Sequence, residues 1–561
     1  MSKKLVEIVL VLAVLIVVNV LASFFYTHLD LTEDKRFTLS DSSVNMISEI
    51  DDNIFVQVLL DGELEAGFKR LRNATGDMLS EFNSINTNID YEFVDPSSGN
   101  LEKINRTREE LRQIGLTPTR VSIMDGKETV EKYIYPYALI SQGDRRTIVS
   151  LLEEQRLGIS NELILNNSVS MLEYKLTNGI FKVWNEVKPN IVLTTGNGEL
   201  ENLETAFLER NLREYYDTGR INLDSLYKID QDADVLIVAR PQKEISQRSQ
   251  FIIDQYIMNG GNVIWLIEKF FVNVDSVAQY QFFVPRPLET GLDDMFFRYG
   301  VKFKDNLVLD LESSTIPQVV GDQGGQPQID FFKYSYHPLL QAGSGHPIVK
   351  NLDRVNVLFP STIEQVKSKA NITHTPLLQS SQYSRYQMFP MRLNFDILRY
   401  EPEPDNFDKG PQTVAMLVEG EFDSYFKNRV SESMRTTLSK IDAEFVEKSP
   451  PSKQLFVSDA DFIKNSYNPE TNQISPTGYN RWEEKAYKGN LDFIVNAIDY
   501  MVDDYGLADA RSKEIKLHLL NTIKAQEESG FWKFINVGLP LLFLGLFAFI
   551  YLFVRKRKYA Q

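Results

Sequence analysis

One short turn in this sequence combines residue types that could hold a ligand with a position where ligands are often held. It follows the apolar segment 191–195, which is predicted to be a buried parallel strand. Open α/β sheets bind ligands beyond the carboxyl ends of such strands, and N–H groups at the start of the next helix favour an anionic or carbonyl group. The candidate ligand turn consists of Thr194, Thr195, Gly196, Asn197, Gly198 and Glu199.

The composition of this turn also fits a structural role. Its two glycines suit a tight turn, but its pattern is not G-x-G-x-x-G, and the chain contains no G-x-x-x-x-G-K-[ST] phosphate loop. The carboxylate of Glu199 would compete with a bound anion for the same N–H donors. We therefore interpret the turn first as structural, with Glu199 helping to cap the following helix, and second as a ligand site.

The other candidates for chemistry are weaker. The chain has no cysteine, which excludes disulfides, thiolate metal ligands and thiol nucleophiles. No two of its five histidines lie four residues apart, and no G-x-S-x-G nucleophile elbow is present. The glycine-rich segment 322–327 is interpreted as a mobile surface loop. The sequence thus predicts no catalytic residue, no metal site and no cofactor.

Apolar segments near both ends of the chain predict two membrane-spanning helices. Residues 5–26 and 534–554 each reach the roughly 20 apolar residues that cross a bilayer core. Basic residues lie between each segment and the nearer end of the chain, at Lys3 and in the run 555–558. By the positive-inside rule both termini are cytoplasmic, and residues from about 27 to 530 lie in the periplasm, outside the inner membrane.

Three residues in these helices are candidates for contact with a neighbouring membrane protein. In lipid, small residues permit close approach of another helix, and a proline frees a carbonyl that a neighbour can satisfy. Polar side chains within an apolar helix can hydrogen-bond across helices. The three residues are Asn19, Gly538 and Pro540.

An acidic body lies between the two helices. Acidic residues outnumber basic residues by 77 to 60, and the formal net charge is −17. Such a surface repels phosphate backbones, so nucleic acid is not expected as a partner. The length of 561 residues predicts about two to four domains.

The body reads as two α/β units. Residues 54–151 follow the order β-α-β-α-β-β, which is typical of a thioredoxin-like domain, although a C-x-x-C motif is missing and the domain is expected to be a scaffold. From Pro189 onward, apolar strands alternate with helices, which predicts a parallel sheet covered on both faces. The predicted segments are an N-terminal transmembrane helix and cytoplasmic end (1–28), a thioredoxin-like domain (29–152), a helical connection (153–188), the first part of an α/β domain (189–270), a β-rich or irregular insertion (271–451), the remainder of the α/β domain with a membrane-proximal segment (452–530), and a C-terminal transmembrane helix with a basic cytoplasmic tail (531–561).

Four stretches of the sequence resemble the GldG family of auxiliary proteins of gliding-motility ABC transporters. They are residues 30–40, 253–261, 490–496 and 511–515. The resemblance implies that the second α/β domain is similar to class I glutamine amidotransferase-like, flavodoxin-like folds. This family often has histidine where Asn197 stands. Amidotransferase catalysis is therefore not implied, and the chain also lacks cysteine.

The resemblance also implies the partners. They would be a multi-pass GldF-like permease and, through it, a cytoplasmic GldA-like ATPase, with two copies of this chain per complex in a gliding bacterium of the Bacteroidetes type. The leading hypothesis is a non-enzymatic periplasmic subunit that couples the permease to an envelope component in gliding motility and associated protein secretion. Two alternatives stay open: a receptor that delivers a small molecule or peptide from the Thr194–Glu199 turn, and an envelope hydrolase.

Overall fold

The structure is a computed structural model of a mixed α/β protein. It describes residues 38–125, 128–153, 159–230, 232–440, 444–512 and 528–559. The chain divides into two compact units, residues 1–513 and 514–561. The predicted N-terminal span, with Asn19, lies outside the described residues.

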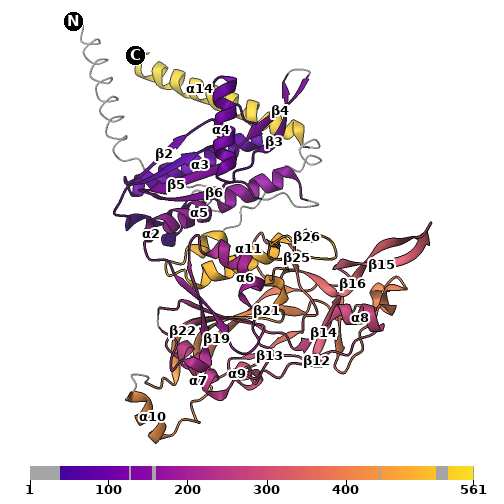
Figure 1. Cartoon of the computed structure of the whole chain (residues 1–561). Helices are drawn as coiled ribbons and strands as arrows, with labels where there is room; N and C mark the ends of the chain where they lie inside the picture. The colour runs from indigo at the N-terminus through magenta and orange to yellow at the C-terminus, as the bar shows by residue number, and fades with distance from the viewer. Residues whose placement is uncertain are drawn as a thin grey trace. The chain divides into compact units, whose positions relative to one another are not determined.

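The first domain of the body is built on a four-stranded sheet with the strand order β2-β1-β5-β6 (Figure 1). Strands β1 and β2 are parallel, as expected for a β-α-β unit, whereas β5 is antiparallel to β1 and β6 is antiparallel to β5. A separate hairpin of β3 and β4 lies off this sheet. The strands are β1 (Ile54–Val58), β2 (Ile89–Phe93), β3 (Thr119–Asp125), β4 (Glu128–Ile134), β5 (Tyr137–Gln142) and β6 (Arg145–Ser150).

Helices cover both faces of this sheet. Helices α3 and α5 bury Leu71 and Ile180 in one core, and α4 buries Leu111 on the opposite face. Gly179 allows α5 to approach closely, because a Cβ there would lie 2.5 Å from the side chain of Val149. The helix expected as a connection is therefore part of this core. The helices are α2 (Asp41–Ser48), α3 (Ala66–Ile85), α4 (Leu101–Gln113) and α5 (Asn161–Trp184).

The second domain contains a ten-stranded sheet whose first half is parallel. Strands β8, β7, β9, β10 and β22 lie side by side in this order and run in the same direction. This confirms the parallel pairing expected from the apolar strands after Pro189. These strands are β7 (Asn190–Thr195), β8 (Asp217–Asn222), β9 (Val235–Ala239), β10 (Asn262–Leu266) and β22 (Lys448–Val457).

Alternate side chains of the parallel strands face two different cores. Leu193 and Ile237 pack with α6 and α11 on one face, and Val192 and Leu236 pack with α7 and α9 on the other. The four helices are α6 (Asn202–Leu212), α7 (Gln247–Met258), α9 (Asp293–Arg298) and α11 (Lys488–Met501).

The region expected as an insertion extends the same sheet. Its four long strands continue the order as β15-β16-β19-β21, each antiparallel to the next, and β21 pairs with β22 in antiparallel fashion. Strand β22 begins at Lys448, before the expected boundary at 452, because the antiparallel ladder with β21 reaches that far. The four strands are β15 (Ser313–Gln323), β16 (Gln326–Ala342), β19 (Asn371–Gln379) and β21 (Thr413–Asp423).

The glycine-rich segment 322–327, expected from the sequence to be a mobile surface loop, forms the exposed tip of the β15–β16 hairpin. Asp322 pairs with Pro327 at the tip of the β15–β16 hairpin, and Gly324 and Gly325 both have positive φ. Two-residue hairpin loops favour that conformation because it matches the twist of the flanking strands. Short elements complete this domain: α8 (Val274–Tyr280), α10 (Glu432–Ser439), β11 (Phe270–Phe271), β12 (Arg286–Pro287), β13 (Val301–Phe303), β14 (Asn306–Asp310), β17 (Val355–Asn356), β18 (Ile363–Gln365), β20 (Ser384–Met388), β23 (Tyr467–Asn468), β24 (Gln473–Ile474), β25 (Tyr479–Asn480) and β26 (Lys485–Ala486).

The C-terminal unit contains an apolar helix. Residues Ser529–Arg557 have a mean hydropathy of 2.5, and no part of the apolar window is buried in protein. Within the described ranges, it is the one helix that is long and apolar enough to cross a membrane. It consists of α13 (Ser529–Lys533), a π-helical turn (Phe534–Gly538) and α14 (Leu539–Tyr559), so Gly538 and Pro540 lie where the π turn changes to α-helix.

Candidate functional site

The parallel strands have a topology that creates a crevice at one edge. Across the sheet these strands lie in the order β8, β7, β9, β10 and β22. The chain therefore passes from β7 to β8 in one direction and then builds β9, β10 and β22 on the other side of β7, so the direction of winding reverses between β7 and β9. Ligands of open α/β sheets bind outside the carboxyl ends of the strands at such a reversal. The predicted turn follows β7 at this position, and a second loop follows β9.

The two loops contact each other through their backbones at this reversal. The carbonyl of Asn197 accepts hydrogen bonds from the N–H groups of Gln242 and Lys243, both at 2.9 Å. The N–H of Asn197 donates to Oε2 of Glu199 at 2.6 Å, and only 7% of Asn197 and 6% of Glu199 is exposed. A ligand at this turn would therefore have to displace the Glu199 carboxylate.

Three other residues of the turn, Thr195, Gly196 and Gly198, also have structural roles. Gly196 has φ +113°, and a Cβ there would lie 2.9 Å from Oδ1 of Asn222. The hydroxyl of Thr195 donates to the carbonyl of Ile221 at 3.1 Å. Gly198 has φ +82° and packs beside Gln242, whereas Thr194 is buried and its hydroxyl has no hydrogen-bond partner.

The expected capping role of Glu199 is wrong. Helix α6 begins at Asn202, and its capping box is formed by Glu201 and Glu204. The carboxylate of Glu199 instead caps the N–H of Asn197 within the turn. Three glutamates lie within six residues here, so the sequence alone does not identify which of them caps the helix.

A cluster of charged residues that the sequence analysis missed lies beside this turn. Arg240 follows β9 with φ +59° and donates from Nη1 to Oδ1 of Asp461 at 2.8 Å. Its Nη2 lies 3.4 Å from Oε1 of Glu204, and Nζ of Lys464 lies 2.8 Å from the same oxygen. Both cations are therefore already paired with carboxylates.

Two further carboxyl groups of the cluster have no cation of their own. Asp459, directly after β22, is fully buried and accepts from the N–H groups of Leu358 and Asp461, both at 2.7 Å. Burial, reinforced by Asp461, raises the pKa of Asp459 to about 8. Burial also raises the pKa of Glu268 well above its usual range, and Asp461 adds to this effect while Arg240 opposes it.

A cavity of about 410 Å³ opens beside this cluster. Charged groups line one part of it, and amides and aromatic rings line the rest. This size and mixture suit a small polar ligand. Among the described residues, no group of His, Cys, Asp and Glu is placed to hold a metal ion. Residues lining the cavity include Arg240, Gln242, Glu268, Asp461, Lys464, Asn480, Trp482, Asn356 and Phe359.

A simple sequence signal marks three of the six residues of this cluster. Arg240 stands one residue after β9, and Glu268 and Asp459 stand two residues after β10 and β22. Charged residues that follow apolar parallel strands come together because the carboxyl ends of those strands share one edge. Glu204 and Lys464 do not follow the signal.

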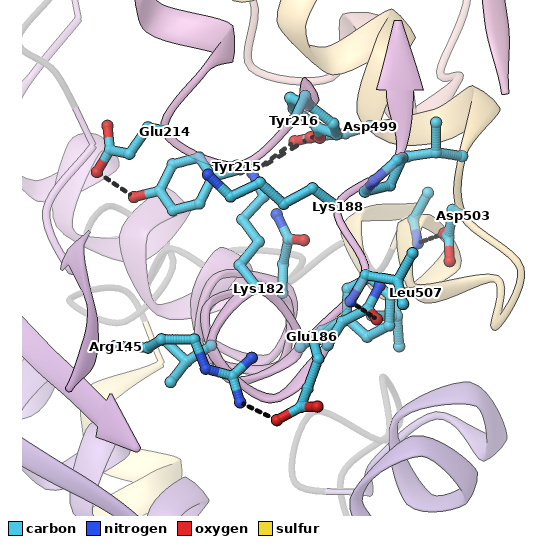
Figure 2. A pocket seen from close by; sticks show the side chains of 18 of the residues that line it. Arg145, Lys182, Glu186, Lys188, Glu214, Tyr215, Tyr216, Asp499, Asp503 and Leu507 are labelled. Atoms are coloured by element: carbon cyan, nitrogen blue, oxygen red, sulfur yellow. Dashed lines mark hydrogen bonds and ion pairs between the residues drawn. The ribbon is translucent and has the colours of Figure 1, made fainter. Parts of the chain in front are cut away.

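A second polar region joins the two domains of the body (Figure 2). Nζ of Lys182 on α5 lies 3.2 Å from Oδ1 of Asp499 on α11. Asp499 also accepts hydrogen bonds from the hydroxyls of Tyr216 and Tyr174, the latter at 3.4 Å. Burial raises the pKa of both tyrosines, so they are neutral donors at ordinary pH. We call this group the junction cluster.

The junction cluster adjoins a pocket of about 220 Å³ and further links between the domains. The hydroxyls of Thr147 on β6 and Tyr215, which follows α6, lie 2.7 Å apart. Nζ of Lys182 lies 4.6 Å from the centre of the Tyr215 ring. The pair of Arg145 and Glu186 at the rim is more exposed, with a distance of 3.3 Å (Figure 2).

Comparisons with known proteins give a family for most of the second domain. The model of a family described as "ABC-type uncharacterized transport system" matches residues 188–497, and the model of a domain of unknown function matches residues 33–141. An uncharacterized protein of Borreliella burgdorferi is 23% identical over 438 residues, which cover 76% of this chain and 79% of the relative. A solved structure described as "mmIFT52 N-terminal domain" matches with a TM-score of 0.30 and 11% identity, covering 56% of this chain and 98% of the solved chain.

Proposed function

Because the chain belongs to the family of ABC-type uncharacterized transport systems, we propose that it is a non-enzymatic accessory subunit that couples an ABC permease to an envelope component. Its family places it in an ABC transport system in an accessory role. The proposal goes further in naming gliding motility, a GldF-like permease, a GldA-like ATPase and two copies per complex, and the resemblance to the GldG family supports these details.

The proposed placement is in the inner membrane, with both termini in the cytoplasm and the body in the periplasm. The apolar helix Ser529–Arg557 and the basic residues at its C-terminal end support this orientation. We propose that Gly538 and Pro540 face the permease. The π turn before Pro540 supports this, because π turns inside helices often mark functional sites.

The proposed domain identities are a thioredoxin-like scaffold and a flavodoxin-like domain of the glutamine amidotransferase type. The strand order β2-β1-β5-β6 supports the first, and the order β8-β7-β9-β10-β22 supports the second. Neither domain is proposed to catalyse a reaction.

The junction cluster is the observation that carries the coupling role. Lys182 and Asp499 form an ion pair that is mostly buried, with 16% and 11% of their side chains exposed. Breaking such a pair leaves a charge without compensation, so displacing one domain against the other is costly. Leu507, which follows α11, also lies in the core of the first domain. The two domains are therefore suited to pass a displacement from one to the other.

The structure of the Thr194–Glu199 turn gives little support to the receptor alternative. The N–H of Asn197 is already bound by Glu199, and the turn is packed against the loop after β9. An anion that entered this site would meet a buried carboxylate.

Replacing the membrane helix tests the proposal. We expect that exchanging residues 534–554 for an unrelated apolar helix keeps the chain in the membrane but releases the permease, measured by affinity purification and mass spectrometry. A matched control exchanges only the basic run 555–558 for other basic residues and should retain the permease. If the permease still co-purifies undiminished after the helix exchange, the helix does not hold the complex together.

A further inference from the structure

The two ends of the periplasmic body meet on one helix. The first described element, α2, contacts α5 and also the 3-10 helix η6 (Leu507–Ser512), which is the last described element of the body. In the sequence, α2 follows the apolar segment 5–26, and η6 precedes the apolar helix Ser529–Arg557. The connections toward both predicted membrane helices therefore leave the body beside α5.

A buried carboxylate fastens the N-terminal end to α5. Oε1 of Glu173 accepts the N–H of Ser40 at 2.7 Å and the hydroxyl of Ser43 at 2.9 Å. Only 3% of Glu173 is exposed, and Ser43 is fully buried. The hydroxyl of Ser40 also caps α2, so the residue that begins this helix ties it to α5. Removing these donors from a buried acceptor is costly, because water cannot replace them.

The C-terminal end is fastened to the next residue of α5. Tyr174 packs with Ala510, and the guanidinium of Arg511 lies 4.9 Å from the centre of the Tyr174 ring. A cation over the face of an aromatic ring is attracted to it. Glu173 and Tyr174 are neighbours in the sequence, so the two ends are held at adjacent positions of one helix.

The two ends also contact each other directly. The hydroxyl of Tyr505 donates to Oε2 of Glu49 at 2.6 Å. Gly506 has φ +74°, and a Cβ there would lie 3.3 Å from Oγ of Ser42. A side chain at position 506 would therefore strain the backbone and crowd the N-terminal end. Movement of one end disturbs the contacts of the other.

Helix α5 connects these contacts with the junction cluster (Figure 2). The hydroxyl of Tyr174 donates to Oδ2 of Asp499 at 3.4 Å. Lys182, the cation of the junction cluster, lies on the same helix about two turns further along. A rigid element that contacts two sites can carry a displacement from one to the other.

We propose that residues 40–49 and 505–511 form one terminal clamp that ties both membrane connections to α5, and that α5 passes a displacement of either connection to the junction cluster. This inference deepens the proposed coupling role and rests on it. Its test uses the chain without a permease, whereas the helix exchange measures permease binding, so failure of one is distinguishable from failure of the other.

Hydrogen exchange of the full-length chain in detergent, followed by mass spectrometry, tests the clamp. In Glu173→Ala, the backbone amides of residues 40–49 and of residues 505–511 should exchange at least about tenfold faster, although Glu173 contacts only the first segment. Glu173→Gln keeps an acceptor for both donors and should stay close to the wild type. Glu162→Ala is the matched control on α5, because the Glu162 side chain is 62% exposed, and it should leave both ends unchanged.

A variant at the other end gives the reciprocal test. Gly506→Ala should speed exchange severalfold in residues 40–49 as well as in residues 505–511. Gly143→Ala controls for backbone strain alone, because Gly143 has φ +56° and a Cβ there meets nothing within 4 Å. Gly506→Ala carries the test if Glu173→Ala does not fold. Faster exchange that is confined to the substituted end would overturn the clamp.

Exchange at the junction tests the transmission along α5. The amides of residues 498–501, in the last turn of α11, should also exchange faster in Glu173→Ala and in Gly506→Ala, because Asp499 contacts α5 through Tyr174 and Lys182. Glu162→Ala and Gly143→Ala should leave this turn unchanged. If both ends open and residues 498–501 keep their wild-type exchange, α5 does not pass the displacement and the proposal is wrong.

Discussion

The junction cluster and the cavity beside Glu268 each contain a buried carboxyl group, but the two carboxyl groups differ in their partners. At the junction, Asp499 is surrounded by Lys182 and two tyrosine hydroxyls, so the charge is matched and its acceptors are used. At the edge, Glu268 has an unpartnered oxygen, and the nearby cations are held by other carboxylates. A matched buried charge serves to hold domains together, whereas a buried carboxyl group without a partner retains its proton and costs stability as the pH rises.

Breaking the matched pair should give the largest effect on stability. Asp499→Ala leaves Lys182 buried without its counterion and removes the acceptor of two tyrosines, which should cost about 3 to 5 kcal/mol of unfolding free energy. Urea denaturation of the full chain in detergent measures this. Glu186→Ala is the matched control, because Glu186 is 84% exposed and pairs with Arg145 at the surface; it should cost about 1 kcal/mol or less. Equal losses of unfolding free energy in the two variants would show that the buried pair of Lys182 and Asp499 stabilises the fold no more than a surface pair.

A substitution in the turn after β7 should give an intermediate loss of stability. Gly196 has φ +113° and little space beside Asn222, so Gly196→Val should lower stability by roughly 1 to 3 kcal/mol through backbone strain. Gly219→Ala on β8 is the control, because a Cβ there meets nothing within 4 Å and its φ is not in the left-handed region. The same denaturation experiment compares them. A neutral Gly196→Val would mean that the turn is not held as tightly as its contacts indicate.

The smallest effect on stability is expected from removing the side-chain contact between Asn197 and Glu199. Nδ2 of Asn197 lies 3.4 Å from Oε1 of Glu199, which is a weak contact, so Asn197→Ala should cost about 1 kcal/mol or less. Thr195→Ala should likewise leave permease binding and motility intact. Motility assays and co-purification check both variants. Loss of function in Asn197→Ala with unchanged folding would return the receptor hypothesis to this turn.

The elements with strong local patterns could be predicted from the sequence. Helix α2 begins with such a local signal, since the hydroxyl of Ser40 accepts from the N–H of Ser43. The parallel strands after Pro189 are predicted from their apolar segments. Strand β8 was missed because Asp217–Asn222 is mostly polar and carries no apolar alternation. Its pairing is decided by the neighbouring strand β7.

The polar clusters could be predicted much less well. Lys182 and Asp499 are 317 residues apart, and nothing local to either residue identifies the other as its partner. The carboxyl edge is predictable from the apolar strands, but the local pattern there points to the glycine-rich turn. The unmatched group is Glu268, whose environment depends on loops after three different strands. Burial and charge balance are properties of the folded chain, so neither can be read from spacing.

The pH dependence of stability tests the contrast between matched and unmatched carboxyl groups most directly. Asp461, Asp459, Arg240 and Lys464 surround Glu268, whose pKa in the folded chain is raised by burial. The folded chain therefore binds a proton there that the unfolded chain has released, and stability is lost as pH rises from Glu's ordinary value toward the raised one.

Urea denaturation between pH 5 and 8 should show this loss in the wild type and a reduced loss in Glu268→Gln. The difference in unfolding free energy between the two chains should grow by up to about 1.4 kcal/mol per pH unit across that window, in favour of the variant. Glu110→Gln, at an exposed residue on α4, is the matched control and should run parallel to the wild type. If Glu268→Gln also runs parallel, Glu268 is already matched in the folded chain and the contrast between the two regions is wrong.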